Sequence, residues 1–378
     1  SVMSRSRDLA DLGGVTTRLD QVGNSEGALS NRNLIINGAM QVAQRGTSAT
    51  VSNSSNEGYS TLDRWYLNFN NTIGGATVFS QSTDAPDGFA NSLKLQCSTV
   101  DTSFTTNQYV TITHRIEAQN IQQLSYGTSG AKPMILSWRM KTETYTGPIT
   151  VALETKDGTS EYYVKSYTPT TSWAEYSCVI PPSTSATINN DSGEGLRLRF
   201  VLAGDSGSSI AASSDSTSWS TTRADYRNDV GNILSNTSNA IYITGVQLEV
   251  GDTSTDFEHI SYGDQLQKCQ RYYYKLLKSG DGSYIPLGTA YATTDIQVAE
   301  RHPITMRADP SIAISGNIRA VDGAAATISS GAAFANQSNT STLAWYTNNN
   351  AFSGLTQFRP YLISGESSGD YFEVDAEL

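Results

Sequence analysis

The segment LRLRFVLA, residues 196–203, carries the pattern that decides the fold. Its apolar residues Leu196, Leu198 and Phe200 alternate with Arg197 and Arg199, which is the period of a strand with one buried face. Seven other short runs that alternate polar and apolar residues lie at 60–69, 92–100, 108–116, 134–143, 149–157, 173–180 and 240–250. Eight such strands without a βαβ rhythm predict a mainly β fold, a two-sheet β-sandwich of jelly-roll type.

The composition fits strands joined by long polar loops. The chain has 378 residues, enough for two or three domains of about 150 residues. Hydrophobic residues make up 38% and charged residues 16%, whereas average domains contain about 45–50% and about 25%. The net charge of −11 argues against nucleic acid or an anionic membrane as the main partner, because both would repel it. A neutral or cationic target stays open.

Membrane insertion and disulfides are not expected. No stretch approaches the about 20 apolar residues of a membrane span, and no secretory signal opens the chain. We therefore expect synthesis in a cytoplasm. Three cysteines, Cys97, Cys178 and Cys269, are far apart, which predicts buried free thiols rather than a disulfide framework or a metal knuckle.

The segment NLIINGAMQVAQRG, residues 33–46, raises a question of topology. An Asn-Gly pair such as Asn37-Gly38 between apolar runs is a strong hairpin signal. Only three apolar residues precede the pair, however, and so short a ribbon would be barely stable. In an all-β context we predict a bulge or bend within the first strand of the sandwich.

Residues 1–32 are predicted to form a separate arm. Heptad-like spacings of three and four connect Leu9, Leu12, Thr16, Leu19 and Gly23. Two heptads are too few for a coiled coil, and Gly13-Gly14 interrupts them. We expect a short or broken helical or extended arm that needs another surface to dock on, because so few apolar residues cannot fold alone.

Beyond the first sandwich, residues 33–258, the rhythm changes. Ser261 and Asp264 match a helix-capping signal, and apolar spacing follows, which predicts a short linking helix over residues 259–271. Alternation returns over residues 272–378 and predicts a second, smaller β-sandwich.

Aromatic residues on irregular or distal segments are the candidate ligand contacts. Residues 204–239 show neither strand nor helix period, and loops of this length are usually functional or disordered. Trp219 and Tyr226 in this segment, and Trp345 and Tyr346 in TLAWYTNNN, are predicted to stack on sugar rings. The alternative is that Trp219 only holds the segment on the sandwich. Two further tryptophans lie in predicted strands and are expected in the core, namely Trp138 and Trp173.

Five segments together resemble bacteriophage fibre and related virion appendage proteins. They are NLIINGAMQVAQRG (33–46), YSTLDRWYL (59–67), VQLEVGDTSTDFEHISYGDQLQKCQRYYYK (246–275), HPITMRADPSI (302–312) and YFEVDAEL (371–378). The resemblance implies an N-terminal attachment segment, a carbohydrate-binding-module-like β-sandwich and a homotrimer. It also implies localisation in the virion, with residues 1–32 attached to other virion structural proteins and the outer body recognising a host cell-surface glycan.

The leading hypothesis is therefore a tail fibre that binds a host glycan. A capsid decoration or head fibre without a dedicated ligand is the alternative, and a polysaccharide depolymerase is a distant third. We expect no enzyme activity, because no spacing selects the carboxylate pair that glycoside hydrolysis requires. The carboxylates considered are Asp63, Glu117, Glu154, Asp205 and Glu249.

No cofactor or metal is predicted either. The histidines His114, His259 and His302 are isolated and suggest no triad or zinc site. Residues near the last strand of the first sandwich could supply oxygen ligands to a structural Ca²⁺, namely Glu249, Asp252 and Asp256. We interpret them instead as a solvated acidic loop.

Overall fold

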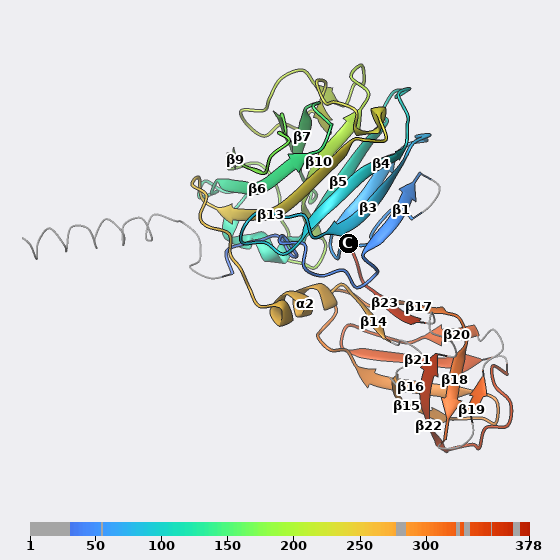
Figure 1. Cartoon of the computed structure of the whole chain (residues 1–378). Helices are drawn as coiled ribbons and strands as arrows, with labels where there is room; N and C mark the ends of the chain where they lie inside the picture. The colour runs from blue at the N-terminus through green and yellow to red at the C-terminus, as the bar shows by residue number, and fades with distance from the viewer. Residues whose placement is uncertain are drawn as a thin grey trace, which may run out of the picture. The chain divides into compact units, whose positions relative to one another are not determined.

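The computed structural model describes residues 31–53, 56–276, 285–322, 326–328, 333–348, 350–365 and 371–378. The chain divides into two compact units, Ser1–Ile260 and Ser261–Leu378 (Figure 1). The predicted heptads of the N-terminal arm lie outside the described residues.

The first unit is a sandwich of two antiparallel sheets (Figure 1). The six-stranded sheet has the order β1 (Ser48–Ser52), β3 (Ala76–Ser82), β4 (Ser92–Thr99), β13 (Ala240–Val250), β6 (Met134–Thr142) and β9 (Ala174–Ile180). The five-stranded sheet has the order β2 (Tyr66–Asn70), β5 (Tyr109–Glu117), β10 (Glu194–Gly204), β7 (Ile149–Thr155) and β8 (Tyr162–Tyr167). Each of the eight predicted segments overlaps a strand, which confirms the mainly β prediction. The sequence pattern missed β1, β3 and β8.

Large aromatic residues join the two sheets. Trp138 on β6 contacts Phe200 on β10, with ring centroids 5.7 Å apart, and Trp65 contacts Phe200 at 6.4 Å. All three side chains are completely buried. Burial of such rings removes about 150–250 Å² each from water, so this cluster stabilises the sandwich. The core prediction is confirmed for Trp138 and wrong for Trp173, which precedes β9 and is only half-buried.

The Asn37-Gly38 pair lies in a turn that precedes β1, so the predicted bulge in a first strand is wrong. Asn37 has a left-handed φ of 61°, and its buried amide donates to the carbonyl oxygens of Val42 and Asp63, both at 2.9 Å. The Gly38 carbonyl accepts from Val246 N at 3.0 Å, and a Cβ at Gly38 would lie 2.1 Å from Val246 O. The pair therefore closes a buried loop against β13, which a bulged strand would not do.

The 204–239 segment is irregular but packed. Beyond Gly204, the last residue of β10, it contains only β11 (Ala211–Ala212), β12 (Tyr226–Arg227) and the 3₁₀ turn η2 (Ile233–Ser235). A second, smaller apolar cluster joins it to the outer face of the five-stranded sheet, formed by Tyr109, Ala152, Val164, Val201, Ile210, Tyr226 and Val230. Arg227 adds ion pairs to Asp215 at 2.9 Å and Asp229 at 3.5 Å. The segment therefore covers part of that face. Another 3₁₀ helix, η1 (Ala118–Leu124), follows β5.

The second unit begins with the predicted helix, α2 (Tyr262–Gln270), and the Ser261 hydroxyl accepts from Asp264 N at 3.2 Å. One sheet has the order β14 (Tyr273–Leu276), β23 (Tyr371–Asp375) and β17 (Ser311–Ser315). The other has the order β19 (Ala326–Ile328), β18 (Ile318–Val321), β22 (Pro360–Gly365), β15 (Ile285–Ala290), β16 (Ile296–Arg301), β21 (Thr342–Asn348) and β20 (Ala333–Asn336). Trp345 on β21 and Phe372 on β23 join these sheets, with ring centroids 5.4 Å apart.

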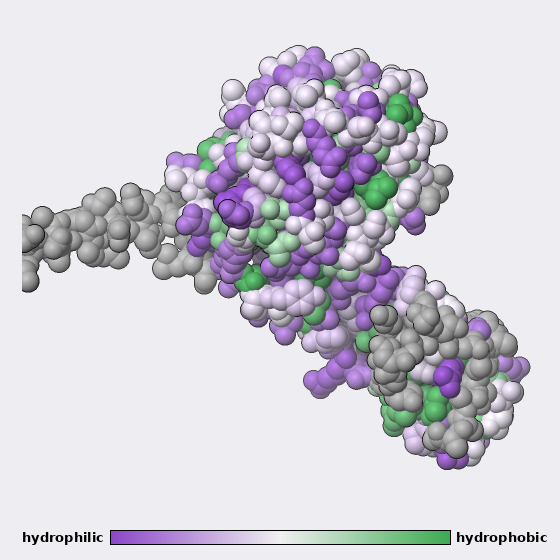
Figure 2. Space-filling model, viewed as in Figure 1, coloured by the Kyte–Doolittle hydropathy of each residue, from purple (hydrophilic) through white to green (hydrophobic). Residues whose placement is uncertain are grey.

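The surface of the first unit is polar, and the thiols of both units are internal. Figure 2 shows hydrophilic and neutral side chains over most of the visible face, with hydrophobic residues in scattered spots. Cys97, Cys178 and Cys269 are buried and free, as predicted. Within the described residues, no helix is both long and apolar enough to span a membrane.

Candidate functional site

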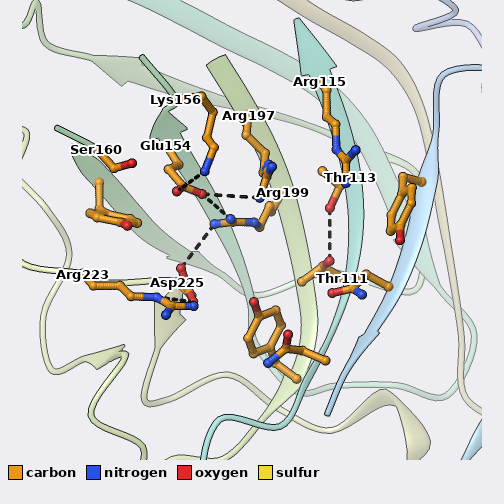
Figure 3. Close-up of a pocket in the computed structure, with 15 residues that line it drawn as sticks. Thr111, Thr113, Arg115, Glu154, Lys156, Ser160, Arg197, Arg199, Arg223 and Asp225 are labelled. Atoms are coloured by element: carbon orange, nitrogen blue, oxygen red, sulfur yellow. Dashed lines mark hydrogen bonds and ion pairs between the residues drawn. The ribbon is translucent and has the colours of Figure 1, made fainter. Parts of the chain in front are cut away.

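A polar cleft of about 490 Å³ lies on the outer face of the five-stranded sheet (Figure 3). All five strands of that sheet, or residues directly beside them, contribute side chains, and the 204–239 segment forms one side. The residues that define this sheet cleft are Tyr66, Asn68, Asn70, Tyr109, Thr111, Thr113, Arg115, Glu154, Lys156, Ser160, Tyr162, Arg197, Arg199, Arg223 and Asp225.

The strand register brings charged residues into one row. Arg115 on β5 lies opposite Arg197 on β10, Arg197 lies opposite Glu154 on β7, and Glu154 lies opposite Tyr162 on β8. Because side chains alternate between the faces of a sheet, their apolar neighbours point into the core. The same LRLRFVLA pattern that predicts β10 thus places its arginines in the cleft.

A second row lies one step along the strands. Tyr66 on β2 is opposite Thr113 on β5, and Thr113 is opposite Arg199 on β10. The hydroxyls of Thr111 and Thr113 are hydrogen-bonded at 3.1 Å (Figure 3). Apart from Arg199, this half of the cleft is lined by neutral hydroxyl and amide groups, with the Tyr66 ring at its edge.

Glu154 is the centre of the charged network on the sheet. Its carboxylate forms ion pairs with Lys156 at 2.8 Å, Arg197 at 3.7 Å and Arg199. Burial alone would raise the pKa of Glu154, but Arg199 and the other two cations outweigh it and hold the pKa below its ordinary value. Glu154 is therefore ionised at neutral pH.

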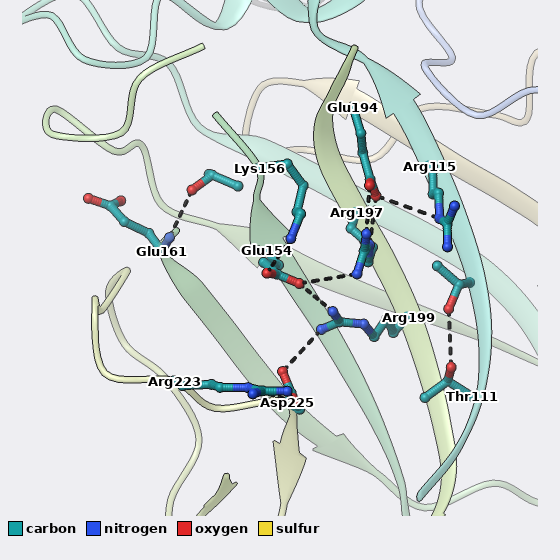
Figure 4. Close-up of polar contacts among 12 residues, drawn as sticks. Thr111, Arg115, Glu154, Lys156, Glu161, Glu194, Arg197, Arg199, Arg223 and Asp225 are labelled. Atoms are coloured by element: carbon teal, nitrogen blue, oxygen red, sulfur yellow. Dashed lines mark hydrogen bonds and ion pairs between the residues drawn. The ribbon is translucent and has the colours of Figure 1, made fainter. Parts of the chain in front are cut away.

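Arg199 connects the sheet to the 204–239 segment (Figure 4). Besides Glu154, it contacts Asp225, with 3.4 Å between Nη1 and Oδ1. Arg223 donates two hydrogen bonds to the other oxygen of Asp225, from Nε at 3.0 Å and from Nη2 at 2.6 Å. These contacts, together with reciprocal backbone hydrogen bonds between Ser220 and Tyr162 at 2.8 and 3.1 Å, fix this side of the cleft.

The opposite rim combines an arginine with an aromatic ring. The Arg115 guanidinium lies 4.6 Å from the centroid of Tyr66 and 3.9 Å from Glu194. Glu194 also accepts two hydrogen bonds from Arg197, both at 2.6 Å (Figure 4). Burial, with a contribution from Glu57, raises the pKa of Tyr66. Tyr66 therefore stays a neutral phenol that can both donate and accept.

The predicted loop contacts do not line the cleft. Trp219 is half-buried, packs against Tyr126 and Tyr163 with centroid distances of 6.0 Å, and donates from Nε1 to the Pro181 carbonyl at 2.7 Å. The geometry favours the alternative role, in which Trp219 holds the segment on the sandwich. Tyr226 is completely buried and its hydroxyl bonds to Asp205 O at 2.9 Å. The prediction that the Tyr226 ring stacks on a sugar is therefore wrong.

The two rings predicted on the second unit differ. Trp345 is 2% exposed and belongs to the core, so the prediction that its face meets a ligand is wrong. Its position on a strand between two neighbours explains the error, because alternate residues of such a strand point inward. Tyr346, the next residue, is half-buried and contacts Tyr291 edge to face at 6.2 Å.

Glu249 is not part of a solvated loop, contrary to the prediction. It is 3% exposed and accepts from Thr255 N at 3.1 Å, Thr255 Oγ1 at 2.6 Å and Gln247 Nε2 at 2.9 Å. Arg32 completes its contacts at 3.1 Å. No cluster of three or more His, Cys, Asp or Glu residues suited to a metal occurs within the described part of the chain.

Sequence reasoning missed most of the cleft. Of the five carboxylates considered for hydrolysis, Glu154 alone lines it. The sequence does carry a signal for it. Charged and tyrosine side chains occupy the polar positions of several strands, and this pattern indicates a sheet face that binds a ligand. Asp225 and Arg223 carried no such signal, since their placement depends on how the 204–239 segment folds back.

Comparisons with known proteins return structural likenesses only. The sequence matches no protein family and no curated protein. A structure described as "CBM4 structure and function" shares 15% identity over 57% of this chain and 99% of its own, with a TM-score of 0.31. The enzymatically active domain of bacteriophage CBA120 tailspike protein 4 shares 12% over 58% of this chain and 21% of its own, with a TM-score of 0.30.

A third similar structure is the family 11 carbohydrate-binding module of a Clostridium thermocellum cellulase. It shares 12% identity over 57% of this chain and 98% of its own, with a TM-score of 0.28. At these sequence identities and TM-scores, the role of a residue in those structures cannot be assigned to a residue of this chain.

Proposed function

We propose that this chain is a glycan-binding protein whose ligand occupies the sheet cleft. The observation that carries the proposal is the cleft itself, a wide, polar hollow with tyrosines at its edges on an otherwise regular sheet. Its volume of about 490 Å³ falls within the usual range for ligand sites, about 300–1,000 Å³.

The chemistry of the lining favours a hydroxylated ligand. An apolar molecule would lose the hydration of many charged and amide groups without replacing their hydrogen bonds, which costs free energy. A saccharide offers hydroxyls to Asn68, Asn70 and Ser160, all of which line the cleft. Its C–H faces can pack on half-exposed rings such as Tyr66 and Tyr162.

The proposed role is binding without hydrolysis. A glycosidase acid needs a raised pKa so that it is protonated at neutral pH. The pKa of Glu154 is shifted in the opposite direction, and its oxygens are occupied by three cations. Glu154 therefore serves to hold Lys156 and the arginines in place.

The proposal extends to a virion fibre that contacts the host surface. The sequence resemblance supports this context, with residues 1–32 as the attachment arm and a homotrimer as the assembled form. Three copies would raise the apparent affinity through effective concentration, so each cleft can bind weakly. Particles assembled with a chain that lacks residues 1–32 should not incorporate it, and normal incorporation would contradict the attachment role.

A glycan array and two matched variants test the binding proposal. Tyr66→Ala should weaken binding of any bound glycan by about threefold to tenfold, the loss expected for one aromatic packing contact. Trp173→Ala removes a half-buried ring at the six-stranded sheet and should bind normally. Equal binding by Tyr66→Ala and the wild-type chain, or equal losses in both variants, would contradict a ligand in the sheet cleft.

A further inference from the structure

We infer that the ligand of the sheet cleft is an acidic saccharide, whose carboxylate, sulfate or phosphate group is bound by the cleft's guanidinium groups. This inference rests on the proposed function and adds the charge of the ligand. The cleft is unlike the chain as a whole, which carries a net charge of −11.

The balance of charge in the cleft is positive. Five cationic side chains line it, namely Arg115, Lys156, Arg197, Arg199 and Arg223, against the two carboxylates of Glu154 and Asp225. Two further carboxylates flank the cleft, Glu194 beside Arg197 and Glu57 beside Asn68. An excess of positive charge remains when all four carboxylates are counted.

The two carboxylates that line the cleft lie deep beside Arg199, and Arg223, Lys156 and Arg115 are more exposed. The side chains of Glu154 and Asp225 are 6% and 1% exposed, and each is surrounded by cationic partners. The side chain of Arg223 is 56% exposed, and those of Lys156 and Arg115 are 25% and 21% exposed. An incoming ligand therefore meets N–H donors and must supply acceptors.

Arg223 is the best-oriented of these donors. Its bonds to Asp225 use Nε and Nη2, which leaves Nη1 for a ligand. Asp225 is itself held by Arg199, so the guanidinium is fixed before binding. A fixed guanidinium loses little freedom on binding and suits planar or tetrahedral anions. In Figure 3, Arg223 and Arg115 lie on opposite sides of the cleft, which places a positive charge at each side.

A neutral saccharide would bind less well for a physical reason. Covering the cleft removes water from the exposed cations, and a neutral ligand does not replace the lost solvation with opposite charge. The site therefore discriminates against neutral sugars as well as attracting acidic ones.

The experiment uses the full chain on an array that pairs each acidic saccharide with a neutral counterpart of the same backbone. Carboxylated members are paired with carboxyl-reduced ones. Sulfated members are paired with their desulfated forms, and phosphorylated members with their dephosphorylated forms. These three arms identify the anionic group. We expect the acidic member of a pair to bind at least about tenfold more tightly.

Arg223→Gln removes the charge but keeps a polar group that can donate a hydrogen bond, on a shorter side chain. The variant should weaken binding of the acidic member by about tenfold or more, as expected for the loss of one charge-assisted hydrogen bond. Binding of the neutral member should stay nearly unchanged. Arg139→Gln, which changes a half-buried arginine on the six-stranded sheet, is the matched control and should change neither. If Arg223→Gln lowers the melting temperature, Arg115→Gln provides the same comparison at the other side of the cleft.

The outcomes separate this inference from the proposed function. Preference for acidic members that both arginine variants abolish would support it. Binding of neutral members that equals or exceeds that of acidic ones, and that depends on Tyr66, would overturn the inference and leave the proposed function standing. Absence of binding to every member would overturn both.

Discussion

The outer faces of the two sheets of the first unit carry similar types of residue, but only one of them forms a large cleft. On the six-stranded sheet, charges close on near neighbours: Lys141 pairs with Asp84 at 2.5 Å, and Arg139 with Glu175 at 3.6 Å. The hollow beside that face measures only about 40 Å³, whereas the sheet cleft measures about 490 Å³. Polar residues on a strand face therefore do not make a site without a second structural feature.

That second feature is the 204–239 segment. Through Tyr226 and its apolar neighbours it covers one end of the five-stranded face and brings Asp225 and Arg223 over the strands. On the six-stranded face, by contrast, Lys94 and Lys141 lie directly over the Tyr242 ring, at 5.1 and 4.8 Å from its centroid. One face is built up into a cleft and the other is filled by its own side chains.

The largest expected effect is that of Arg199→Met. The substitution keeps an unbranched side chain but leaves the buried carboxylates of Glu154 and Asp225 without their shared cation. We expect a loss of about 3 kcal/mol in the free energy of unfolding, the low end for a broken buried pair, because Lys156 and Arg223 remain. Urea unfolding measures it. An effect as small as that of a surface charge would show that Arg199 does not join the sheet to the segment.

Trp219→Ala should have the next largest effect. It removes the ring that packs on Tyr126 and Tyr163, which we expect to cost about 2 kcal/mol, since the ring is only half-buried. Binding to any array ligand should weaken as well, because Arg223 lies on the same segment. Calorimetry gives the stability change and titration the affinity. Unchanged stability with lost binding would instead make Trp219 a direct ligand contact.

Lowering the pH should reduce the stability of the first unit through protonation of Glu154. Its pKa in the folded chain lies below the ordinary value of 4.5, so its ion pairs contribute fully above that pH. As the pH falls below 4.5, the unfolded chain takes up a proton that the folded chain does not, and the free energy of unfolding decreases. Urea unfolding from neutral pH to about pH 3 should therefore show a shallower decline for Glu154→Gln than for the wild-type chain. Parallel curves would contradict this assignment.

The smallest effect is expected on the six-stranded face. Lys141→Met removes the pair with Asp84, whose side chain is 45% exposed, and should change the free energy of unfolding by less than about 1 kcal/mol. The same urea measurement as for Arg199→Met applies, so the two variants form a direct comparison of the faces. A loss for Lys141→Met that matches the loss for Arg199→Met would remove the proposed difference between them.

Strand period predicts the fold well because burial of one face imposes it. Residues 196–203 show their alternation plainly, and each predicted segment overlaps a strand. The short strand β1 was missed because SATVS holds a single fully buried residue, Val51. Asn37 was misassigned because the same Asn-Gly pair serves a hairpin or a buried loop, and only distant partners on β13 select the loop.

The site was less predictable than the fold because it depends on contacts between distant segments. Aromatic residues in irregular sequence are expected to be exposed, yet Tyr226 is buried and anchors its segment. The overall charge of −11 argues against a polyanionic main partner and leaves a neutral or cationic target open, whereas the cleft gathers five cationic side chains. Net charge averages over the whole surface and therefore conceals a local reversal of sign.

The most direct test of the central claim is a crystal structure of the chain with its tightest array ligand. We predict saccharide density in the sheet cleft, with a ring against Tyr66 or Tyr162 and a ligand oxygen within hydrogen-bonding distance of Arg223. Density on the six-stranded face or on the second unit, with the sheet cleft empty, would contradict the account.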